Sequence, residues 1–450
     1  METVSGGGPS MIQLFDNYDE ATRDFHQSML RAGFNFPTVI LNEDGFLPQG
    51  TTSPYRFFMG EEEGRPLYFN EVPVPLNWEI KATNTSASVW DYHHKRADIH
   101  YFTNSGQRLV KAVDWLNDKE QIMWTDCYNQ FGRRYAQIIR HGQDAHMKIY
   151  FDTEGHDVIV DNYVTGNVIL DWQGKKKIFH NQREFFLFYL LRSGLPLEGM
   201  IVNSLASPFL ISHALPREGQ DILIWHEALS EEIPGNMQLI LNGQTPRCNQ
   251  VIIPDQATYQ RALELCELNQ LPSEAIKPLG YIYPILEDKG FAKEILILTN
   301  SDQIEQLDLL LDNLPDFQFR IGAVTEMSEK LMDYGQYSNV QLYPNISMDL
   351  IQKLLRQACF YLDINHGNEI VDAVRAAFEF HCLNMAFEET MHKKAYIADE
   401  FIFSIEEAAS LSNTIKILGN NQKQWQQAIS SQIVQSNHVG KEVYQAIFNR

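Results

Sequence analysis

Hydrophobic periodicity changes twice along this chain of 450 residues, and each change limits the kind of sheet that can form. Unbroken apolar runs alternate with helical patterns in residues 11–60 and 183–290, and again in residues 291–420. Strands that helices bury on both faces read as continuous apolar runs, which is the pattern of parallel sheets. Residues 61–182 instead alternate apolar and polar side chains, with turn residues between the runs, as antiparallel hairpins do. The sequence therefore predicts two parallel sheets and one antiparallel sheet.

The domain boundaries follow from these changes of pattern. We expect a first Rossmann-like α/β domain from residues 11–60 and 183–290, interrupted by an extended antiparallel β-meander over 61–182. A second Rossmann-like domain is expected over 291–420, followed by a C-terminal helix over 421–450. Two such domains favour a GT-B-like architecture, which many glycosyltransferases share, although a fold does not fix a function.

Three local features complete this outline. Residues 1–10, METVSGGGPS, have the composition of a cloning remnant before a natural start at Met11. The apolar runs at 237–241 and 394–398 are expected as strands, and 422–448 as a single helix.

Composition excludes several classes of function. The net charge of −22 disfavours nucleic acid as a partner and opposes simple attachment to an anionic membrane. No apolar run approaches the ~20 residues of a membrane span. The five cysteines lack C-x-x-C spacing, which favours a reducing cytoplasm and argues against disulfides and structural zinc.

Motifs for metal binding are incomplete. Trp225, His226 and Glu227 begin like a zinc-peptidase motif, but no second histidine follows His226 at the required spacing. The pair His93 and His94 has no carboxylate frame. A structural role is favoured for both, and we expect neither a metal nor a cofactor.

The stretch LDINHGNEIVDAVRAAFEFHCLNMAFEET at 362–390 reads as a strand end, a turn and a helix. Ligands of α/β sheets bind at such turns, where the helix N-terminus favours anions. A retaining GT-B enzyme needs a basic pair for the diphosphate and two carboxylates spaced E-x7-E. The turn after the domain's first strand, 299–305, carries acids and no base, and Glu369 and Asp372 are only three residues apart. Favourable interaction with the helix dipole is the simpler explanation of that acidic pair. The pattern predicts a donor-like site without catalytic residues.

The same stretch, together with ILIWHE at 222–227, PGNM at 234–237 and MIQLFD at 11–16, resembles the GtfB-type glycosylation chaperones. These are non-catalytic partners of the accessory-Sec O-GlcNAc transferase of Gram-positive bacteria, and the likeness runs over most of 11–450. The resemblance implies a GT-B fold, a catalytic partner subunit, GtfA, which uses UDP-GlcNAc, and a serine-rich repeat adhesin polypeptide as acceptor in the cleft. It also implies a hetero-oligomer, two copies of each subunit being one arrangement, and work in the cytoplasm beside the export machinery at the membrane.

Two sets of residues are expected to carry these contacts. The tryptophans of the meander are expected at the partner interface because aromatic side chains dominate contact energy: Trp78, Trp90, Trp115, Trp124 and Trp172. Core and cross-strand packing would account for about half of them. Polar and aromatic side chains at strand ends are expected to bind the acceptor: Trp225, His226, Glu227, Asn365, His366, Asn368 and Glu369.

Two other functions stay open from the sequence. An active glycosyltransferase with an unusual donor site would bind a nucleotide sugar on its own. A subunit that only stabilises its partner would not bind the acceptor, and an apolar insertion face would leave it prone to aggregation alone.

Overall fold

A computed structural model describes residues 11–60, 62–83, 85–103, 107–142, 144–286 and 289–449. The cloning remnant expected at 1–10 lies outside the described residues. The chain divides into two compact units, Met1–Leu279 with Tyr444–Arg450, and Gly280–Val443. No helix in the described ranges is both long and apolar enough to cross a membrane.

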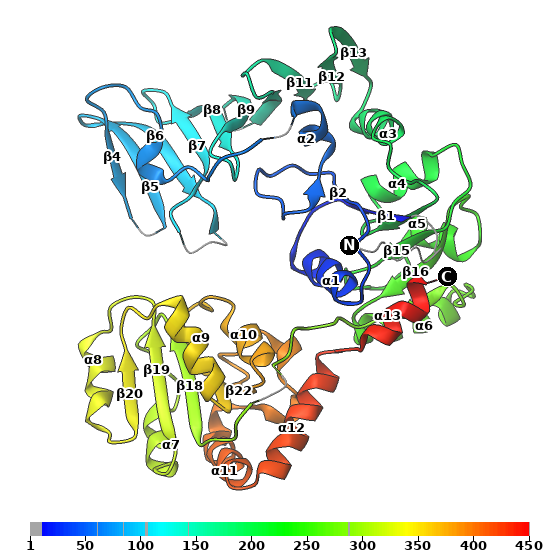
Figure 1. Cartoon of the computed structure of the whole chain (residues 1–450). Coiled ribbons are helices and arrows are strands. Elements are labelled where there is room, and N and C mark those ends of the chain that lie inside the picture. The colour runs from blue at the N-terminus through cyan, green and yellow to red at the C-terminus, as the bar shows by residue number, and fades with distance from the viewer. Residues whose placement is uncertain are drawn as a thin grey trace, which may run out of the picture. The chain divides into compact units, whose positions relative to one another are not determined.

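Unit 1 is built on a seven-stranded parallel sheet with strand order β17-β16-β15-β14-β1-β2-β3 (Figure 1). Its central strands are fully buried, as the continuous apolar runs predict. The strands are β1 (Met11–Phe15), β2 (Thr38–Ile40), β3 (Thr51–Thr52), β14 (Gly199–Val202), β15 (Asp221–Ile224), β16 (Cys248–Ile253) and β17 (Ile276–Pro278). The helices are α1 (Glu20–Arg31), α2 (Pro54–Met59), α3 (Gln182–Arg192), α4 (Ser207–Ala214), α5 (Gly235–Leu241) and α6 (Gln256–Leu268).

The meander forms a ten-stranded antiparallel sheet in which consecutive strands are neighbours throughout. Its strands are β4 (Glu79–Ala82), β5 (Ser86–Asp91), β6 (His94–Tyr101), β7 (Val110–Leu116), β8 (Ile122–Tyr128), β9 (Arg134–His141), β10 (Asp144–Phe151), β11 (Asp157–Asn162), β12 (Val168–Trp172) and β13 (Lys175–Phe179). One half packs on helix α2, where Tyr150 of β10 stacks on Tyr55 with ring centroids 4.3 Å apart. The other half has its own core around Val89, Ile99 and Val113, which side chains of residues 67–80 cover.

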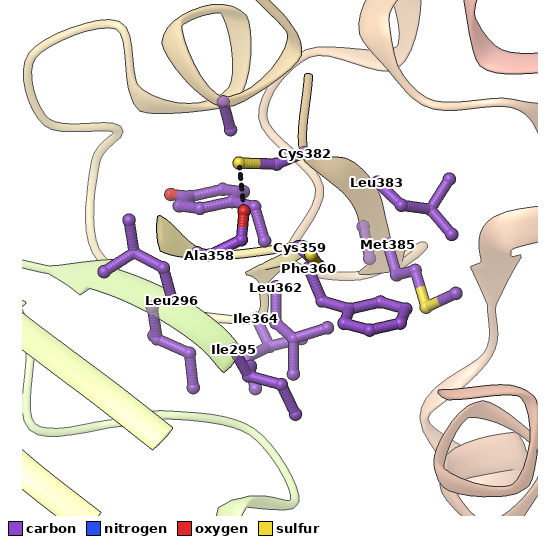
Figure 2. Close-up of a cluster of buried hydrophobic side chains, with 14 of the residues drawn as sticks. Ile295, Leu296, Ala358, Cys359, Phe360, Leu362, Ile364, Cys382, Leu383 and Met385 are labelled. Carbon is purple, nitrogen blue, oxygen red and sulfur yellow. Dashed lines mark hydrogen bonds between the residues drawn. The ribbon is translucent and has the colours of Figure 1, made fainter. Parts of the chain in front are cut away.

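Unit 2 contains a six-stranded parallel sheet with order β20-β19-β18-β21-β22-β23. The strands are β18 (Glu294–Thr299), β19 (Gln318–Ala323), β20 (Val340–Tyr343), β21 (Phe360–Asp363), β22 (Leu383–Phe387) and β23 (Ile402–Phe403). The α-helices are α7 (Leu307–Asn313), α8 (Glu329–Met332), α9 (Met348–Gln357), α10 (Ala373–Glu379), α11 (Ala408–Gly419) and α12 (Gln422–Gln435). Figure 2 shows its core, where Ile295, Phe360 and Leu383 come from three neighbouring strands and Cys382 donates to the Ala358 carbonyl at 3.2 Å.

The structure corrects three of the expected elements. Residues 237–241 lie in helix α5, because Met237, Ile240 and Leu241 bury one helical face at spacings of three and four. Residues 394–398 begin with a short 3₁₀ helix, and the edge strand is β23, which comes later in the chain. The buried Asn384 amide group donates to the Tyr396 carbonyl at 3.0 Å and holds this segment over the sheet.

The C-terminal segment forms two helices, α12 and α13 (Lys441–Phe448). Asn437 has a φ of 58° and lies just after α12, where a left-handed residue ends a helix. The break allows residues 444–449 to rejoin unit 1, where Phe448 packs edge-to-face on Phe25 of α1.

Candidate functional site

The carboxyl ends of β1, β14 and β15 bring polar groups to one edge of the unit 1 sheet. Asn203 follows β14, and its Oδ1 accepts a hydrogen bond from the backbone N–H of Asp16 at 2.8 Å. Its Nδ2 donates to Thr22 Oγ1 on α1 at 2.8 Å. Burial raises the pKa of Asp16. The polar groups at this edge are therefore held in place by hydrogen bonds to one another.

Of the three residues predicted after β15, only two reach the surface. Trp225 is 5% exposed and packs in the unit 1 core. His226 is half-buried beside the Phe25 ring, and burial, opposed by Asp19, lowers its pKa to about 4. Its imidazole is thus neutral near pH 7 and serves as a hydrogen-bonding group rather than as a cation. Glu227 is exposed.

In unit 2, the loop 364–372 follows β21 at the corresponding edge. Asn365 is buried, and its Oδ1 accepts from Thr299 Oγ1 at 3.2 Å and from the Gly367 N–H at 2.8 Å. Gly367 has no room for a side chain, because a Cβ there would overlap the Asn300 amide. Asn365 is thus a structural support of the loop.

The other predicted loop residues differ in how much they are engaged. His366 is exposed, and its Nε2 lies 2.6 Å from Glu305 Oε2. Asn368 is exposed. Glu369 is half-buried, its Oε1 accepts from the Val374 N–H at 3.0 Å, and burial raises its pKa. Of the residues predicted in this loop, His366 and Asn368 are therefore the ones exposed to solvent.

Two bases that the sequence did not suggest reach the same loop from residues after β22. His392 Nδ1 lies 2.6 Å from Asp363 Oδ1, and its Nε2 lies 2.7 Å from the Gly367 carbonyl. Lys393 Nζ pairs with Asp372 at 2.6 Å and lies 3.9 Å from Glu369. In the sequence, the only indication of this site was that the two bases are adjacent. Because they are far from the turn along the chain, the sequence did not connect them with it. Because both bases face carboxylates, neither resembles the free basic pair that a diphosphate requires.

The described linings of two cavities near the sheet edges also offer no free cation. One of about 340 Å³ in unit 2 is lined by Asn300, Asp302 and Glu326, among others, and would repel phosphate. The other, of about 800 Å³, lies in unit 1 between α2 and the meander. Arg56 in its lining pairs with Glu43 at 2.9 Å. No cluster of three or more potential metal ligands occurs among the described residues.

The loop also contains two adjacent residues in the left-handed conformation. Val371 and Asp372 have φ of 49° and 55°, and a β-branched residue there is a conformational outlier. Such strain costs about 1–3 kcal/mol per residue and persists only where neighbouring contacts hold it.

Replacing Val371 with Asn should therefore stabilise unit 2 by about 0.5–1 kcal/mol, since Asn adopts this conformation more readily. Chemical denaturation would measure the change. Val324→Asn is the matched control, because Val324 is 39% exposed against 40% for Val371 and its φ is not positive. Equal changes in the free energy of unfolding for the two substitutions would show that the backbone at Val371 is not strained.

The five tryptophans of the meander do not share one surface. Trp172 packs edge-to-face on Phe58 of α2, and Trp78 packs against the core of the outer half-sheet. Trp90 donates to Ser88 Oγ and lies under Lys81, whose Nζ is 4.8 Å from the ring centroid. Trp115 and Trp124 are cross-strand partners with ring centroids 6.2 Å apart.

Strand register places Trp115 and Trp124 in one row with two further apolar residues. The pairs run from Trp115 to Trp124, to Ile139 and to Met147, across β7, β8, β9 and β10. All four are half-buried in the isolated chain. On β5, Trp90 shares a face with Ser88, which pairs through Asp98 to Asp114 on β7. Asp114 is next to Trp115 in the chain, so its side chain, and with it that of Trp90, points to the face opposite Trp115. The Trp115 row, as we name these four residues, is a partly exposed apolar strip on one face.

Family models match nearly the whole chain. They are described as the GtfB N-terminal domain over 12–58, the GtfB middle domain over 78–180, the GtfB third domain over 182–265, and the GftB/GlyA-F C-terminal domain over 295–432.

Named relatives match over 90% or more of this chain. A Streptococcus gordonii protein is named UDP-N-acetylglucosamine--peptide N-acetylglucosaminyltransferase stabilizing protein GtfB. It is 44% identical over 97% of this chain and 97% of its own length. A protein of the same name from Limosilactobacillus reuteri is 37% identical over 90% of this chain and 91% of its own length.

Solved structures agree with these matches. A chain in a crystal structure described as the GtfA/B complex bound to UDP and GlcNAc superposes with a TM-score of 0.92. It is 44% identical and covers 97% of this chain and 99% of its own length. A chain from accessory secretory protein 1, 2 and 3 of Streptococcus pneumoniae shares the fold, with a TM-score of 0.65 at 13% identity over 98% of this chain and 94% of its own. The chain therefore belongs to the GtfB family.

Proposed function

We propose that this chain is the non-catalytic, stabilising and acceptor-binding subunit of a UDP-N-acetylglucosamine–peptide N-acetylglucosaminyltransferase. The observation that carries the proposal is its 44% identity, over 97% of its length, to a relative with the stabilising name. The catalytic partner is then a GtfA subunit, as in the matched crystal complex, and supplies the UDP-GlcNAc chemistry. The acceptor is a serine-rich repeat adhesin polypeptide, and the assembly is a hetero-oligomer, with two copies of each subunit as the first arrangement to test.

Charge at the candidate donor edge supports the non-catalytic role. His392 and Lys393 reach the loop that follows β21, and both are engaged by carboxylates. Asp302 and Glu326 line the neighbouring cavity. A leaving nucleoside diphosphate carries several negative charges and needs cations that are free to neutralise it. This edge supplies carboxylates instead.

The acceptor is proposed to contact the exposed and half-buried residues at the strand ends. His226 and Glu227 would act in unit 1, and His366, Asn368 and Glu369 in unit 2. Trp225 and Asn365 are buried, so their proposed role is to support these neighbours. Imidazole, amide and carboxylate groups that form hydrogen bonds suit a serine- and threonine-rich chain, which offers hydroxyls and little apolar surface.

The partner is proposed to bind the Trp115 row. Half-buried aromatic and aliphatic side chains in a continuous row resemble the apolar centre of a protein interface. We also propose that the subunit works in the cytoplasm. Any approach to the inner membrane face would go through its partners, because the net charge of −22 opposes direct binding to anionic lipid.

Calorimetric titration of the isolated chain tests the assignment. We expect heat of binding with an unmodified serine-rich repeat peptide and none with UDP-GlcNAc, because the bases described at the donor edge, His392 and Lys393, are engaged by carboxylates. The GtfA–GtfB complex serves as the positive control for nucleotide-sugar binding. Binding of UDP-GlcNAc by the isolated chain would instead favour an active glycosyltransferase. Failure to bind the peptide would favour a subunit that only stabilises its partner.

A further inference from the structure

Both ring nitrogens of His392 face hydrogen-bond acceptors. Nδ1 faces Asp363 Oδ1 and Nε2 faces the Gly367 carbonyl oxygen. A carbonyl oxygen only accepts, so Nε2 must carry a proton. A second proton must lie between Nδ1 and Asp363, on whichever atom holds it. His392 and Asp363 together therefore retain both protons in this conformation.

The surroundings fix this pair in place. Asp363 is 2% exposed, and its Oδ2 also accepts from the His392 backbone N–H at 2.7 Å. Burial opposes a charge on His392, but the hydrogen bond and attraction from Asp363, together with the Gly367 carbonyl and Glu369, outweigh it and raise its pKa. The charged groups that face the ring are Asp363 on β21 and Glu369 on the loop, with Lys393 next in the chain.

Lys393 binds the other end of the loop. Its ammonium pairs with Asp372, which follows the strained Val371, and approaches Glu369. Two adjacent residues thus hold Gly367 and Asp372, at either end of the segment that contains Asn368 and Glu369. A strained backbone needs such external contacts, because it would otherwise relax.

We propose that His392 and Lys393 form a clamp that holds the loop 366–372 in its strained conformation and so positions the exposed side chains of that loop. His392 and Lys393 are positioning residues: they act through the loop and do not themselves touch a ligand. The consequence for acceptor affinity rests on the proposed function, whereas the clamp itself does not.

The clamp makes the loop sensitive to pH. Because the folded-state pKa of His392 lies above its ordinary value, the clamp is complete below about pH 6.5. As the pH rises through the folded-state value, one of the two protons leaves, so either Nδ1 or Nε2 faces its acceptor without a proton and one of the two ring contacts is lost. His438 is an internal reference in unit 2, since its Nδ1 accepts from the Tyr283 N–H at 3.2 Å and burial lowers its pKa.

Histidine-selective NMR titration of the full chain tests the first step. We expect one signal that is absent from His392→Gln to titrate above pH 6.5, and the signal absent from His438→Gln to titrate below it. A value for His392 at or below 6.5 would overturn the clamp.

Hydrogen exchange tests the second step and needs neither acceptor nor partner. In His392→Gln and Lys393→Met, the amides of 366–374 should exchange about tenfold faster, while those of β18 and β21 keep their protection. Adding Val371→Asn to His392→Gln should restore much of the protection, because the loop then stores less strain. Unchanged exchange in both single variants, or no rescue, would refute the proposal.

Acceptor affinity separates this proposal from the proposed function. If the clamp variants loosen the loop and weaken peptide binding, the clamp and the assignment of the acceptor to this loop are both supported. If they loosen the loop without changing peptide affinity, the clamp holds and the assignment of the acceptor to this loop fails.

Discussion

Replacing Arg247 with Leu should lower the free energy of unfolding of unit 1 by about 3–5 kcal/mol. Arg247 and Asp221 are an ion pair with fully buried side chains, joined by two hydrogen bonds of 2.8 and 2.9 Å. The other three guanidinium N–H groups donate to the carbonyls of Leu197, Arg217 and Glu218. A methyl group at Gly219 would overlap the guanidinium. The substitution leaves the Asp221 charge buried without its partner, which accounts for the expected size of the loss.

Urea denaturation of unit 1 would measure this loss. Arg261→Leu is the matched control, because Arg261 pairs with Glu264 at 3.1 Å on the surface and its side chain is 42% exposed. That substitution should cost less than about 1 kcal/mol. Asp221→Leu combined with Arg247→Met should be more stable than Arg247→Leu, since no charge then stays buried alone. A loss below about 1 kcal/mol for Arg247→Leu would show that the interior accommodates the Asp221 charge.

The position of this pair separates stability from function. Asp221 begins β15 and Arg247 precedes β16, so both lie at the amino ends of the strands. The candidate acceptor residues of unit 1 lie at the carboxyl ends, as is usual for ligands of parallel sheets. Stability and recognition are therefore assigned to opposite edges of the same sheet.

The parallel sheets and the antiparallel meander were predictable because periodicity is a local property. Ile295–Leu298 must be buried on both faces whatever packs over them, and the alternation in 61–182 fits only a sheet with two different faces. The error at 237–241 has the same origin. A short apolar run is equally compatible with a strand and with a buried helix. Only the burial of Met237, Ile240 and Leu241 at i, i+3 and i+4 spacing, which the structure shows, identifies the segment as a helix.

The site was harder to predict because its contacts are not local. Loop 366–372 is held by His392 and Lys393, which reach it from beyond the next strand. The tryptophans could be assigned to the meander but not to a face, because the face that is covered depends on residues 67–80 and on α2. Burial of Asn365 likewise results from Thr299 on another strand.

Replacing Trp124 with Ala should weaken binding to the catalytic partner by about 30-fold or more, since aromatic anchors at the centre of an interface contribute about 2 kcal/mol or more. Trp124 stacks on Trp115 in the Trp115 row, and its removal opens a gap in the middle of that strip. Surface plasmon resonance with the partner would measure the affinity, and circular dichroism would verify that the sheet is retained.

Trp90→Ala is the matched control for Trp124→Ala. Trp90 belongs to the same sheet and is half-buried like Trp124, but it points to the other face under Lys81. If the Trp115 row is the interface, Trp90→Ala should change the affinity by less than about threefold. Equal losses for both variants would mean that the partner binds through sheet stability or through both faces. A loss confined to Trp90→Ala would move the interface to the opposite face, where Lys81 and Trp90 would be its centre.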